Sequence, residues 1–376
     1  MTSKTTAPFL PALTGIRALC VFLIFFKHFN PFSETHALYA FTHQFFSFLS
    51  FFFVLSGFLI TYRYFTTGTL KRSTIADYLV NRMSRVFPIL ILLISATFFL
   101  KWMLDEPGSQ SLTKTYLYNI TLLKGFSSEY YLTGIGPSWS MSVEELFYLI
   151  APLIFLWVKK PGGLIAFVLY MYILGVLLTF CFRLFPVDGF FSNYHFTFLT
   201  TFFGRAFEFA CGIYLAYVVQ GRFSNRLLQR IPFPTLTGCT LVLAVIIAQY
   251  GIAVHYGTVN GVDTWWGLCI NHLVLPVGIM IVFYGLIYEQ SLLKSLLSTP
   301  WMLRMGNATY SFYLLHTSFV AGWIALYIHP NVWIIFLCMI IVSLLFHAMV
   351  EQPAATIIRK WWNRRRKLHH PPGVNP

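Results

Sequence analysis

This sequence has few charged residues. Only 10% of the 376 residues are charged, whereas 57% are hydrophobic. A soluble globular protein carries roughly 25% charged residues, so this chain has too little polar material to cover a water-soluble fold of its size. The composition therefore excludes a soluble enzyme, and the abundance of apolar residues excludes an intrinsically disordered chain.

Cysteine is also scarce. The six cysteines stand singly in or at the edges of apolar segments, and none forms a Cys-x-x-Cys pair. This usage excludes a secreted disulfide scaffold and offers no zinc or redox motif. We therefore expect no metal site.

Acidic residues are outnumbered: 26 Lys and Arg face 12 Asp and Glu, which gives a formal net charge of +14. On a very apolar chain, this surplus indicates either nucleic-acid binding or a membrane protein with basic loops on one side. The positions of the basic residues distinguish the two possibilities.

Long apolar runs fill most of the chain. A helix needs roughly 20 mostly apolar residues to cross a bilayer, and about ten runs reach this length. We predict an all-α, polytopic transmembrane helical bundle over residues 11–353, after an N-terminal segment at 1–10 and before a basic tail at 354–376. The predicted spans are 12–31, 44–62, 87–104, 140–158, 163–182, 198–219, 235–252, 266–287, 308–328 and 332–350.

Basic residues gather on one side of these spans. With the N terminus inside, most of them fall in inner loops, for example at 63–85, 222–230 and 359–367. Positively charged loops stay in the cytoplasm, so we predict that both termini are cytoplasmic. This arrangement removes nucleic acid as a partner and leaves membrane lipid, against which the basic tail is expected to lie.

Arg17 and His28 are ionisable residues within the first predicted span. Such residues are costly in a membrane, so each is a candidate functional residue. Eleven residues of helix bring the two side chains to one face, about 16 Å apart along the axis. The alternative is two unrelated side chains that reach toward the nearer membrane surface, but a shared face favours one cavity.

Acidic residues enter the predicted spans at two places. Glu144 and Glu145 begin a span, where the helix dipole favours acidic side chains. Arg205 and Glu208 are three residues apart and can pair on a helix. A structural ion pair and a functional role are both open for them.

Three further features complete the candidates. Trp139 and Ser140 lie five and four residues before Glu144, and His316 lies among tyrosines in the ninth run. His316 is either a structural, hydrogen-bonded histidine or a functional one. Arg82 and Arg85 lie one helical turn apart, as ordinary positive-inside charge or as a bidentate site for phosphate.

These residues lie in segments that, in the same order, resemble the acyltransferase-3 family. Its members are integral membrane acyltransferases that O-acylate bacterial surface glycans and other acceptors. The resemblance covers nearly the whole chain. The segments are LPALTGIRALCVFLIFFKH at 10–28, FFFVLSGFLIT at 51–61, RMSRVFP at 82–88, SWSMSVEELFYLIAP at 138–152, GRAFEFACGIYLAY at 204–217, NATYSFYLLH at 307–316 and EQP at 351–353.

The resemblance implies an O-acyltransferase of the bacterial inner (plasma) membrane. The donor would be cytoplasmic acyl-coenzyme A, with acetyl-coenzyme A expected, used as a co-substrate and not as a permanently bound cofactor. Arg17, Arg82 and Arg85 would hold its phosphates. The acceptor would be a hydroxyl of a carbohydrate or glycan-lipid at the outer face.

His28 is the expected base because histidine titrates near neutral pH. It would act by direct transfer or through an acyl-histidine, and both routes are open. Glu144, with Glu145 beside it, would orient the imidazole. The residues expected to contact the acceptor are Trp139, Ser140, His316, Arg205 and Glu208.

Two other functions are compatible with a polytopic chain. A transporter or flippase for a glycan-lipid or acyl group would use the buried ionisable residues as a path. A membrane sensor would leave the ordered segments unexplained. The sequence leaves the acceptor and the oligomeric state open.

Overall fold

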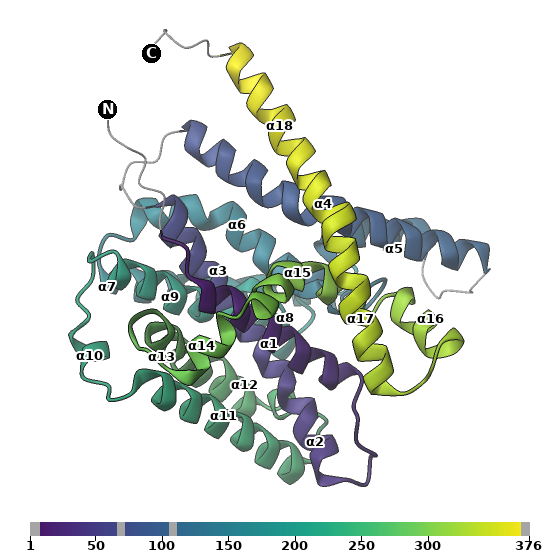
Figure 1. The fold of residues 1–376 in the computed structure, drawn as a ribbon, viewed down its shortest axis with the longest axis horizontal. Helices are drawn as coiled ribbons and strands as arrows, with labels where there is room; N and C mark the ends of the chain where they lie inside the picture. The colour runs from purple at the N-terminus through teal and green to yellow at the C-terminus, as the bar shows by residue number, and fades with distance from the viewer. Residues whose placement is uncertain (1–7, 66–71, 105–110, 370–376) are drawn as a thin grey trace.

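The computed structural model describes residues 8–65, 72–104 and 111–369, which form helices joined by turns (Figure 1). Within these ranges there is no strand, only one isolated β-bridge between Ser127 and Phe190. The predicted all-α fold is confirmed. Residues 1–7 of the predicted N-terminal segment and residues 370–376 of the predicted tail lie outside the described residues.

The helices follow one another along the chain with short connections. The α-helices are α1 (Pro11–His28), α2 (Ala37–His43), α3 (Leu49–Tyr64), α4 (Arg72–Met103), α5 (Leu112–Ile120), α6 (Trp139–Trp157), α7 (Pro161–Leu184), α8 (Tyr194–Thr200), α9 (Phe202–Val219), α10 (Arg226–Gln229), α11 (Pro234–Tyr256), α12 (Trp265–Cys269), α13 (Leu275–Tyr288), α14 (Leu292–Leu297), α15 (Pro300–Leu315), α16 (Phe319–Tyr327), α17 (Val332–Phe346) and α18 (Gln352–His369). The 3₁₀ segments are η1 (Gln44–Phe48), η2 (Leu123–Phe126), η3 (Gly136–Ser138) and η4 (Gly261–Asp263), and the π-helical turns are η5 (Ile270–Val274) and η6 (His347–Glu351).

Nine helical stretches within the described ranges are long and apolar enough to cross a membrane. The span predicted at 308–328 differs, because it is broken between α15 and α16. Ser318 begins α16 as its N-cap, and its side chain accepts a hydrogen bond from the backbone N–H of Val320. A capped helix start interrupts the run, and neither piece reaches the roughly 20 residues that a bilayer requires.

Helices α3 and α9 pack closely against each other. A Cβ atom on Gly57 would lie 2.3 Å from the carbonyl oxygen of Phe209, and one on Gly212 would lie 2.0 Å from that of Val54. Small residues at facing positions let two membrane helices approach at backbone distance. This contact fixes α3, which forms one wall of the site described below.

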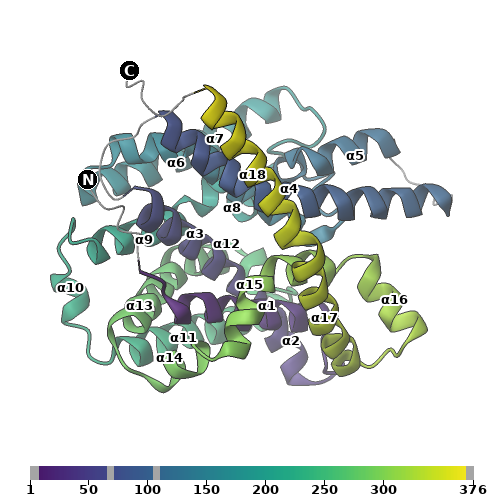
Figure 2. The same ribbon diagram turned by 45° about the horizontal axis from the view of Figure 1, so that its top comes forward.

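Helix α1 packs against α15 and also contacts α3, α13 and α14. Its Phe25 ring lies 6.0 Å from that of Phe312 on α15. The final helix, α18, lies against α4 in both views (Figures 1 and 2). Trp362 of α18 donates a hydrogen bond of 2.8 Å to Asp77 of α4. Helices α1, α3, α4 and α15, together with α6, surround the candidate site.

Candidate active site

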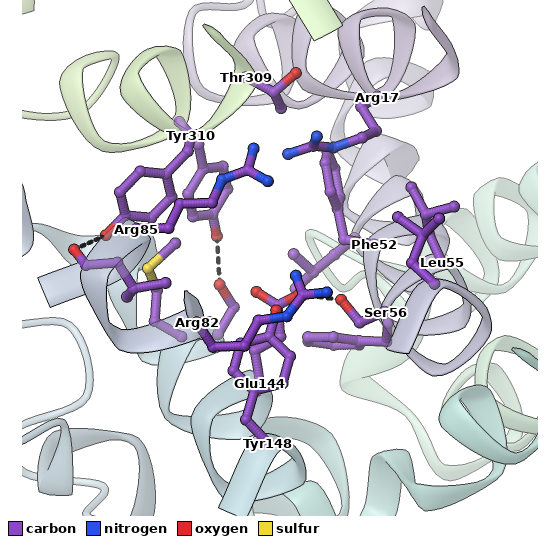
Figure 3. Close-up of a pocket in the computed structure, with 17 residues that line it drawn as sticks. Arg17, Phe52, Leu55, Ser56, Arg82, Arg85, Glu144, Tyr148, Thr309 and Tyr310 are labelled. Atoms are coloured by element: carbon purple, nitrogen blue, oxygen red, sulfur yellow. Dashed lines mark hydrogen bonds between the residues drawn. The ribbon is translucent and has the colours of Figure 1, made fainter. Parts of the chain in front are cut away.

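Three arginines converge on a narrow pocket of about 90 Å³, which we call the inner pocket. Arg17 comes from α1, and Arg82 and Arg85 come from α4. Figure 3 shows their guanidinium groups turned toward the same space. The sequence predicted that these residues share a site, and the structure brings them together. The pocket is also lined by Leu49, Phe52, Phe53, Leu55, Ser56, Leu59, Val86, Ser140, Met141, Glu144, Tyr148, Thr309, Tyr310 and Tyr313.

Arg82 is held by aromatic faces. Its guanidinium carbon lies 5.6 Å from the ring centre of Tyr64 and 5.4 Å from that of Tyr148. Its Nε is buried and has no hydrogen-bond partner among the described residues. A cation held by π-faces keeps its N–H donors for a ligand. Arg82 is therefore well suited to receive an anion.

Arg85 is held near a buried carboxylate. Its Nε lies 3.7 Å from Glu351, whose side chain is only 4% exposed. Glu351 also accepts a hydrogen bond of 2.7 Å from Ser311, and Nδ1 of His347 lies 2.8 Å away. Glu351 belongs to the Glu-x-Pro segment, which received no role from the sequence alone. Its place in the structure is to orient Arg85.

Glu144 and Glu145 take different positions. Glu144 lines the inner pocket and accepts a hydrogen bond from Ser56. Glu145 is buried, and one of its carboxylate oxygens has no partner among the described residues. The sequence paired Glu144 with His28, but His28 lines a different pocket. The pairing stays a prediction, and the contact that the structure gives Glu144 is with Ser56.

The inner pocket lies beside a larger basic cavity. Arg82 and Arg85 also line a cavity of about 460 Å³, to which Arg63 and Arg359 contribute further positive charge. A smaller neighbouring pocket joins Arg17, Arg63, Arg82 and Arg85 to the chain start at 8–10. The ends of α1 and α3 that the sequence assigns to the cytoplasm therefore meet at one basic entrance.

A second cavity of about 500 Å³, the outer pocket, surrounds His28. His28 is the last residue of α1. Lys27 and Asp263 give this pocket one charge of each sign. Trp139 also lines it and stacks on Phe46 with ring centres 6.2 Å apart. Charged and aromatic side chains in one concave site are suited to a polar ring such as a sugar.

The predicted residues Arg17 and His28 thus do not line one common pocket. The inner and outer pockets are neighbours, and among the described residues only Leu49 and Tyr313 line both. Trp139 lines the outer pocket, and the adjacent Ser140 lines the inner one. His316 is fully buried, and its ring centre lies 5.2 Å from that of His28.

A family model described as an acyltransferase domain matches residues 10–350. The chain belongs to the acyltransferase-3 family. This membership confirms the resemblance and places the chain among multi-pass membrane O-acyltransferases. The inner and outer pockets are therefore candidate sites of an acyl transfer.

One curated relative of this acyltransferase is similar over part of its length. Over 192 residues, the chain is 28% identical to this relative, the peptidoglycan O-acetyltransferase OatA of Listeria monocytogenes. The match covers 47% of this chain and 29% of OatA, so the chain spans less than a third of that relative. No solved structure matches.

Lys124 of the acyltransferase was missed in the sequence. It is fully buried in η2. Its ammonium lies close to four oxygens: Thr133 O at 2.5 Å, Ile135 O at 3.0 Å, and the side chains of Asn119 and Ser138 at 3.1 Å. Burial lowers the pKa of Lys124 to about 7. Lys124 thereby fixes the loop that leads into Trp139 and Ser140.

Arg205 and Glu208 line neither pocket. Their side chains are fully buried and lie 2.9 Å apart. Ser50 donates to Glu208 at 3.1 Å, and Arg205 donates to the carbonyl oxygen of Leu199 at 2.9 Å. Of the two roles left open by the sequence, the structural ion pair explains these contacts without a ligand.

Proposed function

We propose that the protein transfers an acetyl group from acyl-coenzyme A, bound from the cytoplasm, to a hydroxyl of a carbohydrate in the outer pocket. The observation that carries this proposal is the convergence of Arg17, Arg82 and Arg85 beside a pocket that contains His28. Arg82 has no carboxylate within ion-pair distance among the described residues. An unpaired cation inside a membrane protein is costly, so an anionic ligand would stabilise this arrangement.

The negative charge of acyl-coenzyme A is complementary to the arginines on the inner side. Its phosphates would bind at the basic entrance formed by Arg63, Arg82 and Arg85, where guanidinium groups offer bidentate hydrogen bonds. The uncharged arm that carries the thioester would then extend through the inner pocket. That pocket leads from Arg17 toward Tyr313, in the direction of His28.

His28 would remove the proton of the acceptor hydroxyl in the outer pocket. In direct transfer, the hydroxyl oxygen bonds to the acyl carbon, the carbon–sulfur bond breaks, and the thiolate receives the proton from His28. In the alternative route, the imidazole nitrogen of His28 bonds to the acyl carbon, the carbon–sulfur bond breaks, and the thiolate takes the imidazole proton and leaves as the thiol. The acceptor hydroxyl oxygen then bonds to the acyl carbon, the carbon–nitrogen bond breaks, and the hydroxyl proton returns to the imidazole. Trp139, Lys27 and Asp263 would hold the acceptor ring.

The acceptor is proposed to be a bacterial envelope glycan, which places the protein in the inner (plasma) membrane. OatA, whose name states that it acetylates peptidoglycan, supports a peptidoglycan-type acceptor. The test uses purified protein in proteoliposomes with labelled acetyl-coenzyme A and peptidoglycan fragments. Label attached covalently to the glycan supports a transferase, whereas label that crosses the membrane unattached indicates a transporter and contradicts the proposal.

A further inference from the structure

The boundary between the two pockets is formed by two side chains. Leu49, the first residue of α3, and Tyr313 of α15 line both the inner and the outer pocket. They are buried, with 6% and 7% exposure. The inner pocket has a volume of about 90 Å³ and the outer pocket one of about 500 Å³.

Tyr313 is locked in place across this boundary. Its hydroxyl donates a hydrogen bond of 2.9 Å to the carbonyl oxygen of Pro137, which lines the outer pocket. The same hydroxyl lies 2.7 Å from that of Ser140, which lines the inner pocket. With both hydrogen bonds made within the protein, the ring is held rigidly and offers no strong polar group to a passing ligand.

We propose that Leu49 and Tyr313 form a gate that restricts transfer to short, uncharged acyl groups. This inference rests on the proposed function, in which the acyl group moves from the inner to the outer pocket. The gate contains an alkyl side chain and an aromatic ring with a satisfied hydroxyl. A phosphate or carboxylate would lose its hydration there without gaining a partner, so charged groups stay on the inner side.

The same gate separates the thioester from water in the outer pocket. If Leu49 is truncated, water reaches the acyl carbon from the outer side. Its oxygen bonds to that carbon, the carbon–sulfur bond breaks, and the products are the free acid and the thiol. Loss of the gate should therefore raise acceptor-independent hydrolysis of the donor at the same time as it relaxes acyl selectivity.

The test compares acetyl-, butyryl- and succinyl-coenzyme A with purified protein in proteoliposomes. One added methylene in a tight apolar site is discriminated by about 10-fold or more, so we expect the wild type to prefer acetyl over butyryl by at least this factor. Leu49→Ala should lower the preference about 10-fold and raise hydrolysis, with a smaller effect in Leu49→Val. Succinyl transfer should be low in the wild type.

Two matched variants separate the gate from general loosening. Val54→Ala truncates a fully buried residue of the same helix that lines neither pocket, so the acyl preference should not change. Tyr313→Phe keeps the ring and should keep the acetyl preference, even if turnover falls. Leu49→Val retains most of the packing of the wild type, so the test still gives a result if Leu49→Ala fails to fold.

The outcomes are distinct. An unchanged acyl preference in both Leu49 variants, with wild-type hydrolysis rates, overturns the gate while the proposed function stands. Efficient succinyl transfer by the wild type also overturns it. A wild type that transfers no acyl group from any donor overturns the proposed function, and the gate with it.

Discussion

The imidazole rings of His28 and His316 lie 5.2 Å apart, and one hydrogen bond determines which nitrogen of His316 carries the proton. Nδ1 of His316 lies 2.7 Å from the carbonyl oxygen of Tyr313. A carbonyl only accepts hydrogen bonds, so Nδ1 carries the proton, and Nε2 of the neutral ring is an acceptor. This Nε2 is buried and has no partner among the described residues. We predict that it shares a proton with His28.

This geometry predicts different effects for the two histidines. Replacing His28 by Ala should reduce acyl transfer by about 10²-fold to 10⁴-fold, the usual contribution of a positioned base. His316→Ala should lower kcat with a smaller effect on KM. It should also shift the pH–rate profile, because the ring nitrogen predicted to share a proton with His28 is lost. Steady-state kinetics from pH 5.5 to 9 checks both. An unchanged pH profile in His316→Ala would limit His316 to a structural role.

The inner arginines should affect the donor more than the acceptor. Arg82→Gln removes a charge-assisted hydrogen bond worth about 1.5–3 kcal/mol, so KM for acetyl-coenzyme A should rise about 10-fold or more. Arg85→Gln should act in the same direction. Arg183→Gln is the control, because Arg183 contacts Tyr194 and lines neither pocket. Equal effects on donor and acceptor KM values would contradict a donor site at Arg82.

The lowered pKa of Lys124 predicts that the free energy of unfolding depends on pH. Its pKa is lowered from 10.5 to about 7 by burial. Between these values, the unfolded chain binds more protons than the folded protein, so the free energy of unfolding should rise with pH across this window. Lys124→Met cannot titrate and should lack this rise, although it also loses stability because four oxygens lose their donor. Thermal unfolding in detergent at pH 6, 7.5 and 9 measures the difference, and parallel curves would refute it.

The buried pair of Arg205 and Glu208 predicts a stability effect without a catalytic one. Arg205→Met leaves an unpaired carboxylate and should lower the free energy of unfolding by about 3–5 kcal/mol. The double variant Arg205→Met/Glu208→Leu should recover much of this loss and transfer acetyl groups at near wild-type rates. Thermal unfolding and transfer assays are measured side by side. A stable double variant without activity would instead assign the pair a functional role.

Much of the fold follows from local sequence patterns. The apolar runs predicted the helices, because helix length depends only on helix geometry. The spacing of Arg17 and His28 predicted a shared face and one cavity, but the two residues line separate, neighbouring pockets. The break after His316 was not predicted, since hydropathy does not register the cap that Ser318 provides. A single polar side chain changes the backbone there without changing the apolar character of the run.

The contacts within the site were harder to predict. Arg82 and Arg85 were found because they lie one turn apart on a single helix. The contact of Glu144 with Ser56 joins α6 to α3, and the ion pair of Arg85 with Glu351 joins α4 to the far end of the chain. Such pairs depend on how helices pack against one another, which one sequence does not specify.

Lys124 shows the same limitation in a loop. A lone lysine between two spans is typical of a solvated surface, and its neighbours along the chain give no sign of burial. Only the folding of residues 119–138 around its ammonium brings the four oxygens together. The shared position of Leu49 and Tyr313 between the two pockets is likewise a property of packing.

The central claim is that the donor enters beside Arg82 and the acceptor binds beside His28, on opposite sides of the membrane. The most direct test uses proteoliposomes of one orientation, with labelled acetyl-coenzyme A supplied only to the side of the Arg63 loop and glycan fragments only to the other side. We predict covalent label on the glycan with the wild type and none with His28→Ala. Label on glycan supplied to the donor side alone, or equal labelling by His28→Ala, would contradict the claim.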